Sequence, residues 1–278
     1  MTETNTHNRD KNYRVQADSL FLKALGVSND AGDVKPSMYS KYRQICRFIE
    51  LFMERMERTQ AIKQSRVKVL DIGSGKGYLT FAMYDQLAKA GLNPKVDGVD
   101  TRLEMVDLCN DAAKASSFEN LAFHNMKAED FARGYYDAIV ALHACDTATD
   151  DALFYGIKSK SKLIVCAPCC QHEVLVSLRD SKVSNRNFIS HGLFLQKQAD
   201  LITDNARVML LKSQGYQVDV IDFVSTEHTQ KNTLIVAVKK SKPSLSHIAT
   251  YEAYKKAFGF EGIKLEFLMR DAGLIRKK

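Results

Sequence analysis

The sequence of 278 residues contains no tryptophan, only 4 prolines and no apolar run approaching the roughly 18 to 20 residues that a membrane span needs. Its first fourteen residues are polar and lack the apolar segment of a secretory signal. We therefore expect residues 1–16 to be a disordered leader and the protein to be cytoplasmic, with no membrane partner.

Cysteine is scarce and unevenly placed. Three of the 6 cysteines fall within five positions, as Cys166, Cys169 and Cys170, which is a poor layout for a disulfide framework and favours reduced thiols. The Cys-x-x-Cys spacing also fits zinc, but Cys166 is expected inside a strand and no second Cys or His pair follows elsewhere. We predict no metal site. Small buried side chains at a strand end are a competing interpretation of the paired cysteines.

The charge balance is basic. Lysine and arginine number 40 against 33 aspartates and glutamates, giving a formal net charge of +7 and a pI near 9.0. This balance is compatible with a polyanionic partner. Hydrophobic residues make up 45% of the chain, enough for an ordinary globular core.

Apolar strands alternate with helical patterns from residue 67 onward, which predicts a mostly parallel sheet covered on both faces. The strands are expected at 67–72, 95–100, 121–126, 137–143 and 162–168, with helices at 77–90, 102–115, 147–157 and 194–214. The runs 218–225 and 232–238 predict a closing hairpin. We divide the chain into a helical extension (17–62, with helices at 17–26 and 37–60), a core domain (63–242) and a basic helical tail (243–278).

A glycine-rich loop is the most informative feature. The predicted strand ends at Asp71, and Gly73, Gly75 and Gly77 form the turn into a helix, where glycines allow a tight turn and a close approach of ligand to backbone. The third glycine comes one residue earlier than in a dinucleotide fingerprint, and Tyr78 stands where that fingerprint has glycine. This spacing fits the amino-acid end of S-adenosylmethionine, whose ammonium group Asp71 would receive directly or through water.

Asp100 closes the second predicted strand, where a carboxylate can accept both ribose hydroxyls. The loop and this acid resemble motifs I and II of class I S-adenosylmethionine-dependent methyltransferases. The resemblance implies a Rossmann-like α/β fold with five parallel strands and a C-terminal hairpin, and S-adenosylmethionine as cofactor. The glycine loop with Asp71 and Tyr78, together with Asp100, is predicted to bind this cofactor. Further predicted cofactor-binding residues are Ser74, Leu79, Thr101, Ala128, Glu129, Leu142 and His143.

Two further segments, LHACDTATD and PCCQHE, follow the fourth and fifth strands. With GSGKGYL and EHTQKN, they resemble a methyltransferase branch that contains the eukaryotic tRNA 2′-O-methyltransferases, over residues 37–240. Asp146 departs from the glycine usual in that branch, and the zinc modules of the eukaryotic tRNA enzymes are absent. A Ser40–Lys41 pair near the cofactor mouth also occurs in that branch.

Ligands of α/β sheets lie beyond the carboxyl ends of the strands, so both segments should border the transferred methyl group. We predict that His143, Asp146 and His172 orient or deprotonate the nucleophile. The predicted substrate-binding residues are Cys169, Cys170, His228, Lys231 and Asn232. An alternative is attack on a pyrimidine by a cysteine thiolate, although in such enzymes the Pro-Cys pair follows strand four instead of strand five.

Together these features predict a methyltransferase acting on RNA, either tRNA or rRNA. The alternatives are a methyltransferase that acts on a protein or small molecule, and a non-catalytic protein that binds a nucleotide or a methionine derivative. Asp200, Asp204 and Arg207 share one face of the helix before the hairpin, and we interpret them as a solvent-exposed ion-pair face.

Overall fold

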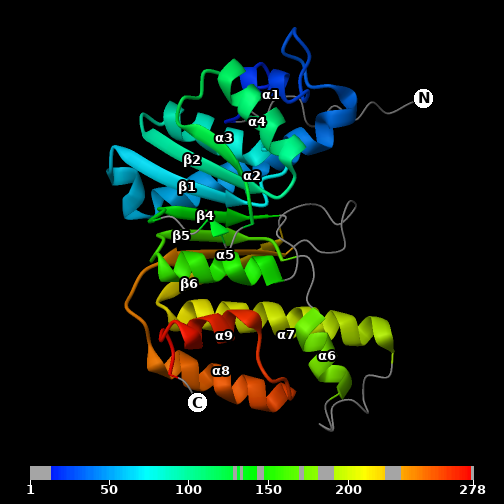
Figure 1. Ribbon diagram of the computed structural model, residues 1–278, viewed down its shortest axis with the longest axis vertical. Helices are drawn as coiled ribbons and strands as arrows, with labels where there is room; N and C mark the ends of the chain where they lie inside the picture. The colour runs from blue at the N-terminus through cyan, green and yellow to red at the C-terminus, as the bar shows by residue number, and fades with distance from the viewer. Residues whose placement is uncertain are drawn as a thin grey trace, which may run out of the picture.

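The computed structural model of the chain describes residues 14–127, 130–131, 134–142, 147–168, 172–180, 191–222 and 233–276 (Figure 1). Its strands form a seven-stranded sheet in the order β3-β2-β1-β4-β5-β7-β6. Their bounds are β1 Arg66–Ile72, β2 Asn93–Asp100, β3 Leu121–Asn125, β4 Ala138–Ala141, β5 Leu163–Cys166, β6 Tyr216–Asp222 and β7 Thr233–Lys239.

Strands β1 to β5 pair in parallel, whereas β7 runs antiparallel to both of its neighbours, β5 and β6. Every residue of β4 and β5 is buried, which is why their sequences AIVA and LIVC are uninterrupted apolar runs. The predicted Rossmann-like sheet of five parallel strands and a C-terminal hairpin is confirmed. Its third, fourth and fifth strands end one or two residues earlier than predicted.

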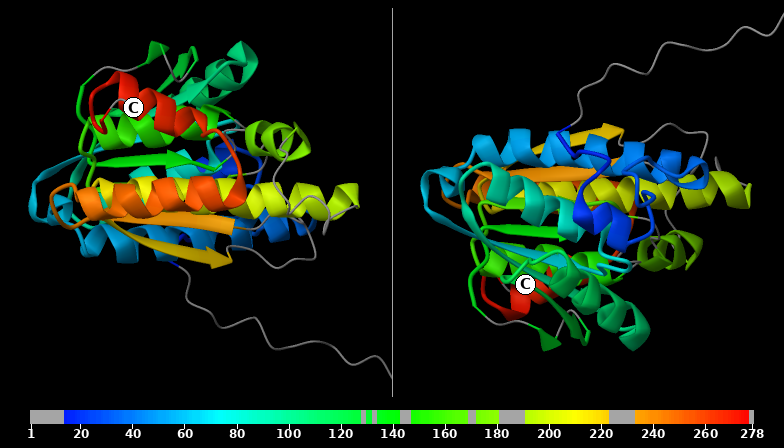
Figure 2. Two further views of the ribbon diagram at one scale, coloured as in Figure 1. Left: turned by 90° about the horizontal axis from the view of Figure 1, so that it is seen from below. Right: turned by 90° about the horizontal axis from the view of Figure 1, so that it is seen from above.

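Helices lie on both sides of the sheet (Figure 2). One hydrophobic core joins the sheet to α1 Leu20–Ala24, α2 Tyr39–Glu57, α3 Tyr78–Lys89 and α4 Leu103–Ala115. A second core on the other face contains α5 Thr147–Lys158, α6 His172–Asp180, α7 Gly192–Ser213, α8 Leu245–Phe258 and α9 Lys264–Asp271. Short 3₁₀ turns, η1 Pro36–Met38 and η2 Gln60–Lys63, flank α2.

The helices expected in the N-terminal extension and the C-terminal segment are present. Helix α2 buries Ile45, Phe48, Ile49 and Phe52 against the sheet domain, following its helical spacing of apolar residues. Helix α6 was not predicted, because its sequence HEVLVSLRD begins inside the motif PCCQHE after strand five and is only nine residues long.

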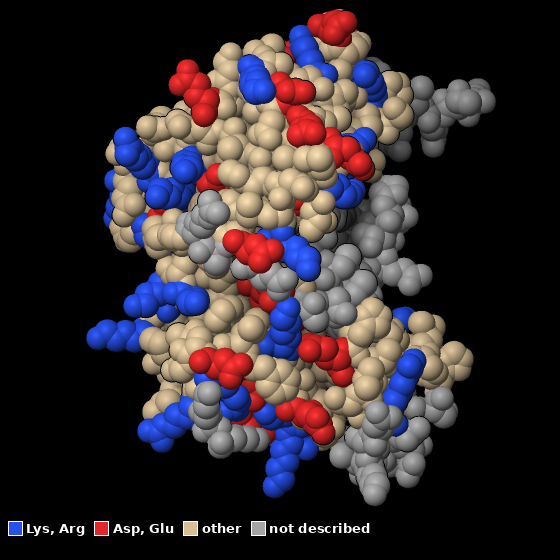
Figure 3. Space-filling model, in the orientation of Figure 1, with Lys and Arg blue, Asp and Glu red and all other residues tan. Residues whose placement is uncertain are grey.

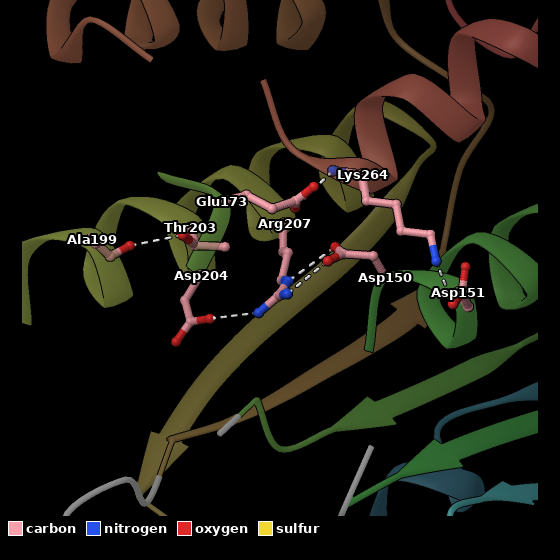
Figure 4. A network of polar contacts seen from close by, with 8 residues as sticks. All are labelled: Asp150, Asp151, Glu173, Ala199, Thr203, Asp204, Arg207 and Lys264. Atoms are coloured by element: carbon pink, nitrogen blue, oxygen red, sulfur yellow. Dashed lines mark hydrogen bonds and ion pairs between the residues drawn. The ribbon is translucent and has the colours of Figure 1, made fainter. Parts of the chain in front are cut away.

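Arg207 of α7 corrects the predicted solvent-exposed ion-pair face. Its side chain is 1% exposed, with Nε and Nη2 donating to both carboxylate oxygens of Asp150 in α5 at 3.0 and 2.7 Å. Asp204 accepts from Nη1 at 3.1 Å (Figure 4). The prediction is wrong for Arg207 because its side chain is buried against Asp150 of α5, a tertiary contact that helical spacing alone does not reveal.

Lys264, the first residue of α9, joins the C-terminal helices to α5 and α6. Its Nζ donates to Asp151 of α5 at 2.7 Å, and its backbone N–H donates to Glu173 of α6 at 3.0 Å (Figure 4). Charged side chains thus connect α5, α6, α7 and the start of α9 on one face of the sheet.

Candidate functional site

A cavity of about 580 Å³ lies at the carboxyl ends of β1 and β2. Helix α2 forms one wall, and the loop between β1 and α3 forms another. The cavity is lined by Lys41, Gln44, Asp71, Ile72, Gly73, Ser74, Gly75, Lys76, Tyr78, Leu79, Val99, Asp100, Thr101, Arg102, Met126, Leu142 and Ala148.

The glycine loop is held against β2 by its own backbone. The N–H groups of Gly73 and Ser74 donate to the carbonyl of Val99 at 2.8 and 3.1 Å. Gly77 has a φ of +69° and precedes the first residue of α3, and a Cβ added there would lie 3.0 Å from the Phe123 ring. Glycine is therefore required at Gly77 both by backbone conformation and by packing.

Asp100 is surrounded by hydrogen-bond donors. Its carboxylate accepts the N–H groups of Gly75 at 2.8 Å and Arg102 at 2.9 Å, and the Arg102 guanidinium at 3.0 and 3.2 Å. Partial burial opposes its ionisation, but the hydrogen bonds from Arg102 and Gly75 outweigh this effect and lower the pKa of Asp100. The group at the end of β2 is thus an ionised acceptor.

Asp71, at the end of β1, has a different environment. It is 5% exposed and accepts one side-chain hydrogen bond, from Thr80 Oγ1 at 2.6 Å. Burial raises the pKa of Asp71 to about 6, the Thr80 hydrogen bond lowers it in part, and the charge of Asp100 raises it further. A cationic ligand group beside Asp71 would favour its ionised form.

Helix α2 contributes a cation to the cavity wall. Lys41 Nζ donates to Gln44 Oε1 at 2.6 Å and lies 5.9 Å from the centre of the Tyr78 ring. Burial lowers the pKa of Lys41. The helical extension therefore takes part in the cavity instead of merely preceding the sheet domain.

The residues present fit S-adenosylmethionine. The Gly75 N–H points at Asp100, so the loop approaches the carboxylate that would accept ribose hydroxyls, with no side chain between them. Asp71 lies under the loop, where it can attract the ammonium group, and Thr101 and Met126 line the side beyond Asp100. Leu142 and Ala148, at the end of β4 and the start of α5, line the same cavity.

Nine of the predicted cofactor-binding residues line this one cavity: Asp71, Gly73, Ser74, Gly75, Tyr78, Leu79, Asp100, Thr101 and Leu142. Gly77 shapes the turn beneath it. His172 is the first residue of α6, is exposed and is not part of the cavity lining. Predicted residues that lie outside the described ranges are Ala128, Glu129, His143, Asp146, Cys169, Cys170, His228, Lys231 and Asn232.

Five cavity residues were not predicted from the sequence: Gln44, Ile72, Val99, Arg102 and Ala148. Arg102 follows Asp100 by two positions and was recoverable from that neighbour, whereas Gln44 lines the cavity only because α2 packs beside the glycine loop. Among the described residues, no three His, Cys, Asp or Glu side chains are grouped so that they could hold a metal ion. No helix in the described ranges is long and apolar enough to cross a membrane.

Fold and cavity together define a class: the chain has the Rossmann-like α/β sheet of a methyltransferase domain, with a cavity whose residues fit S-adenosylmethionine. Residues 40–177 match a family described as a methyltransferase domain, a range that contains α2, the glycine loop and strands β1 to β5.

Among curated proteins, the chain is 26% identical over 198 residues to a glutathione S-transferase C-terminal domain-containing protein of Homo sapiens, and equally to that of Macaca fascicularis. The match covers 62% of this chain and only 30% of each of those proteins.

Two solved structures are also similar. An SAH-bound methyltransferase of Podospora anserina is 12% identical with a TM-score of 0.45, and the match covers 80% of this chain and 86% of that one. An rRNA methylase of Streptococcus thermophilus is 14% identical with a TM-score of 0.44, covering 69% of this chain and 96% of that one.

Proposed function

We propose that this protein transfers the methyl group of S-adenosylmethionine to RNA, either tRNA or rRNA, in the cytoplasm. The observation that carries the proposal is the cavity in which the glycine loop, Asp71 and Asp100 meet beneath the ends of β1 and β2. The net charge of +7 supports a polyanionic substrate over a neutral one.

When bound, S-adenosylmethionine supplies an electrophilic methyl group. Asp100 would hold the ribose hydroxyls, and Asp71 would pair with the ammonium group, so that the cofactor is fixed at two points. The predicted proton acceptors His143, Asp146 and His172 follow β4 and β5, whose carboxyl ends share the edge of the sheet that bears the cavity. A nucleophile held there within about 3 Å of the methyl group would be in near-attack geometry.

The test is transfer of radiolabelled methyl groups to total RNA and, separately, to total protein from cells that lack this gene. The loss variant is Gly75→Arg, because Gly75 has a φ of +56° and an added Cβ would lie 3.3 Å from Arg102 Nη2. The matched control is Gly273→Arg. Gly273 also has a left-handed backbone conformation, with a φ of +69°, but it is exposed and has nothing within 4 Å of an added Cβ.

We expect RNA to be labelled by the wild type and by Gly273→Arg, and labelling to fall to background for Gly75→Arg. Label found only in protein would replace the proposal with a protein methyltransferase. Label in neither pool, with cofactor binding intact, would overturn the RNA proposal and direct the search to small molecules.

A further inference from the structure

The parallel strands begin at the end of the sheet opposite the cavity. This end carries a band of basic side chains, which we call the basic edge. At this edge β1, β2, β4 and β5 begin and β7 ends, so segments far apart in the sequence meet. In Figure 3, Lys and Arg side chains line the left margin of the molecule, where the β7–α8 connection, orange in Figure 1, runs. The basic edge consists of Arg58, Lys63, Arg66, Lys68, Lys95, Lys158, Lys160, Lys162, Lys239, Lys240 and Lys242.

The basic edge accounts for the whole net positive charge of the sequence. The segments 58–68, 93–95, 116–120, 134–137, 158–162, 214–217 and 239–244 contain these eleven cations and two acids, Glu119 and Asp137. Of the chain's 40 basic and 33 acidic residues, this leaves 29 basic against 31 acidic residues elsewhere. The residues outside these segments are thus slightly acidic in sum, and among the described residues the excess of cations lies at the basic edge.

Most of these cations are not neutralised within the protein. Arg58 is paired with Glu54 and Lys162 with the buried Asp137, but Lys63, Arg66, Lys160 and Lys242 form no ion pair with any residue that the structure describes. Burial lowers the pKa of Lys239, and the positive charge of Lys160 lowers it further, so like charges are crowded here. An anion bound at this edge would relieve that repulsion.

The spacing of the cations suits an extended polyanion. Strand order places Lys95 on β2, Lys68 on β1, Lys162 before β5 and Lys239 on β7. Neighbouring strands lie about 4.8 Å apart, so this row extends over roughly 19 Å. Two large apolar side chains are exposed in or beside the described part of this edge, Tyr135 at 41% and Leu245, which follows the last segment, at 74%, against eleven cations. Interfaces between proteins are instead centred on apolar and aromatic groups and are depleted in lysine.

We propose that the basic edge is a docking surface for the phosphate backbone of an RNA that reaches around the molecule to the cavity. This proposal rests on the proposed RNA methyltransferase activity and adds a second contact region to it. Strand β1 has 7 residues, so the two edges of the sheet are separated by about 23 Å. A folded RNA of tRNA size can contact both edges, whereas a single nucleotide cannot.

The test compares two triple variants of the full chain with the same change in net charge. The edge variant is Lys160→Glu, Lys240→Glu and Lys242→Glu, and the control is Lys35→Glu, Lys114→Glu and Lys256→Glu, all at exposed positions. The probe is unfractionated tRNA, titrated between 50 and 200 mM salt, with poly-L-glutamate as the acidic polypeptide probe. Thermal unfolding and S-adenosylmethionine affinity report that both variants remain folded.

We expect the edge variant to bind tRNA about 10-fold or more weakly than the control, and the slope of log affinity against log salt to fall by about 2 to 3 units, because three phosphate contacts are lost. Equal tRNA affinity of the two variants would overturn the proposal. Equally tight binding of poly-L-glutamate, lost in the same edge variant, would also overturn it and assign the edge to an acidic protein. Edge-dependent tRNA binding by a wild type that labels no RNA would refute the proposed activity while leaving the surface in place.

Discussion

At the scale of single residues, the cavity holds two carboxylates in opposite electrostatic states. Asp100 receives backbone and guanidinium donors, which lower its pKa, whereas Asp71 is buried with Thr80 as its side-chain partner, and its pKa rises to about 6. Hydrogen-bond donors keep Asp100 at the end of β2 ionised, so it is a permanent acceptor. Desolvation disfavours the charge of Asp71 at the end of β1, which a cationic ligand would stabilise.

This difference leads to a prediction for Asp71→Asn. A folded-state pKa of about 6, against roughly 3.9 in the unfolded chain, means that the folded state binds the extra proton, so stability falls as pH rises from about 4 to 6. The asparagine removes the buried charge and can still accept the Thr80 hydrogen bond. We expect it to raise the free energy of unfolding at pH 8 by up to about 3 kcal/mol and to weaken S-adenosylmethionine binding.

Urea unfolding at pH 4 and pH 8, with cofactor titrations at pH 8, checks this. At pH 4 the two proteins should have nearly equal stability, because Asp71 is then protonated in the folded wild type. An Asp71→Asn protein less stable than the wild type at pH 8 would contradict the assignment of Asp71 as a destabilising charge.

At the scale of elements, ion pairs as well as apolar packing connect α7 to its neighbours. Arg207 is nearly inaccessible and bidentate to Asp150 of α5, which lies in the first turn of the helix that follows β4. Breaking a buried pair leaves the partner charge desolvated, whereas replacing both members with apolar groups can be neutral.

We therefore predict that Arg207→Met destabilises the protein by about 3 to 5 kcal/mol, because Asp150 remains buried with its bidentate partner removed. The double variant Arg207→Met and Asp150→Leu should recover most of this loss. Chemical denaturation of the wild type, both single variants and the double variant gives the coupling energy. Additive effects of the two substitutions would show that the pair is not a coupled unit.

Element prediction from sequence succeeded where period and length were unambiguous. The strands and long helices follow from apolar runs of strand length and from helical spacing, as in α2. Arg207 was assigned to solvent because spacing identifies a face of a helix without showing what covers it. Helix α6 was not predicted because its nine residues begin inside the motif PCCQHE, which was interpreted as part of the active site and not as a helix. Gln44 reaches the cavity only through tertiary packing of α2, which no local pattern encodes.

At the scale of the whole molecule, the C-terminal helices belong to the second hydrophobic core. Tyr251, Ile263, Leu265 and Met269 have no exposed surface, and Glu266 is 1% exposed, accepting hydrogen bonds from Tyr251 and Lys255 at 2.6 Å each. The basic tail that we expected is thus helical and packed, so its removal would expose apolar surface on α5 and α7.

A chain ending at Ser244 should accordingly fail to unfold cooperatively, and should bind a hydrophobic dye and aggregate at micromolar concentration, since burying each such side chain contributes roughly 1.5 to 3 kcal/mol. Calorimetry and size-exclusion chromatography of the shortened protein test this expectation. A monomeric product with a sharp thermal transition and wild-type cofactor affinity would mean that α8 and α9 form an independent appendage.

Charge distribution is the whole-molecule property that sequence could not supply. The net value of +7 was evident from composition, but its confinement to one side arises because seven separate connections converge at the edge where the parallel strands begin. Such convergence depends on strand order. The composition is compatible with a polyanionic partner, and the topology shows where on the described surface the excess of cations lies.

The position of β7 has a consequence for how the protein is made. Strand β7 lies between β5 and β6, although it is the last strand of the sheet along the chain. On the ribosome, β5 can pair with β4 on one side, but its other side stays open until residue 239 has left the exit tunnel, some seventy residues after β5 itself. At about 5 to 20 residues per second this interval lasts several seconds, during which the nascent chain exposes the open side of an apolar strand, and faster translation would shorten that exposure.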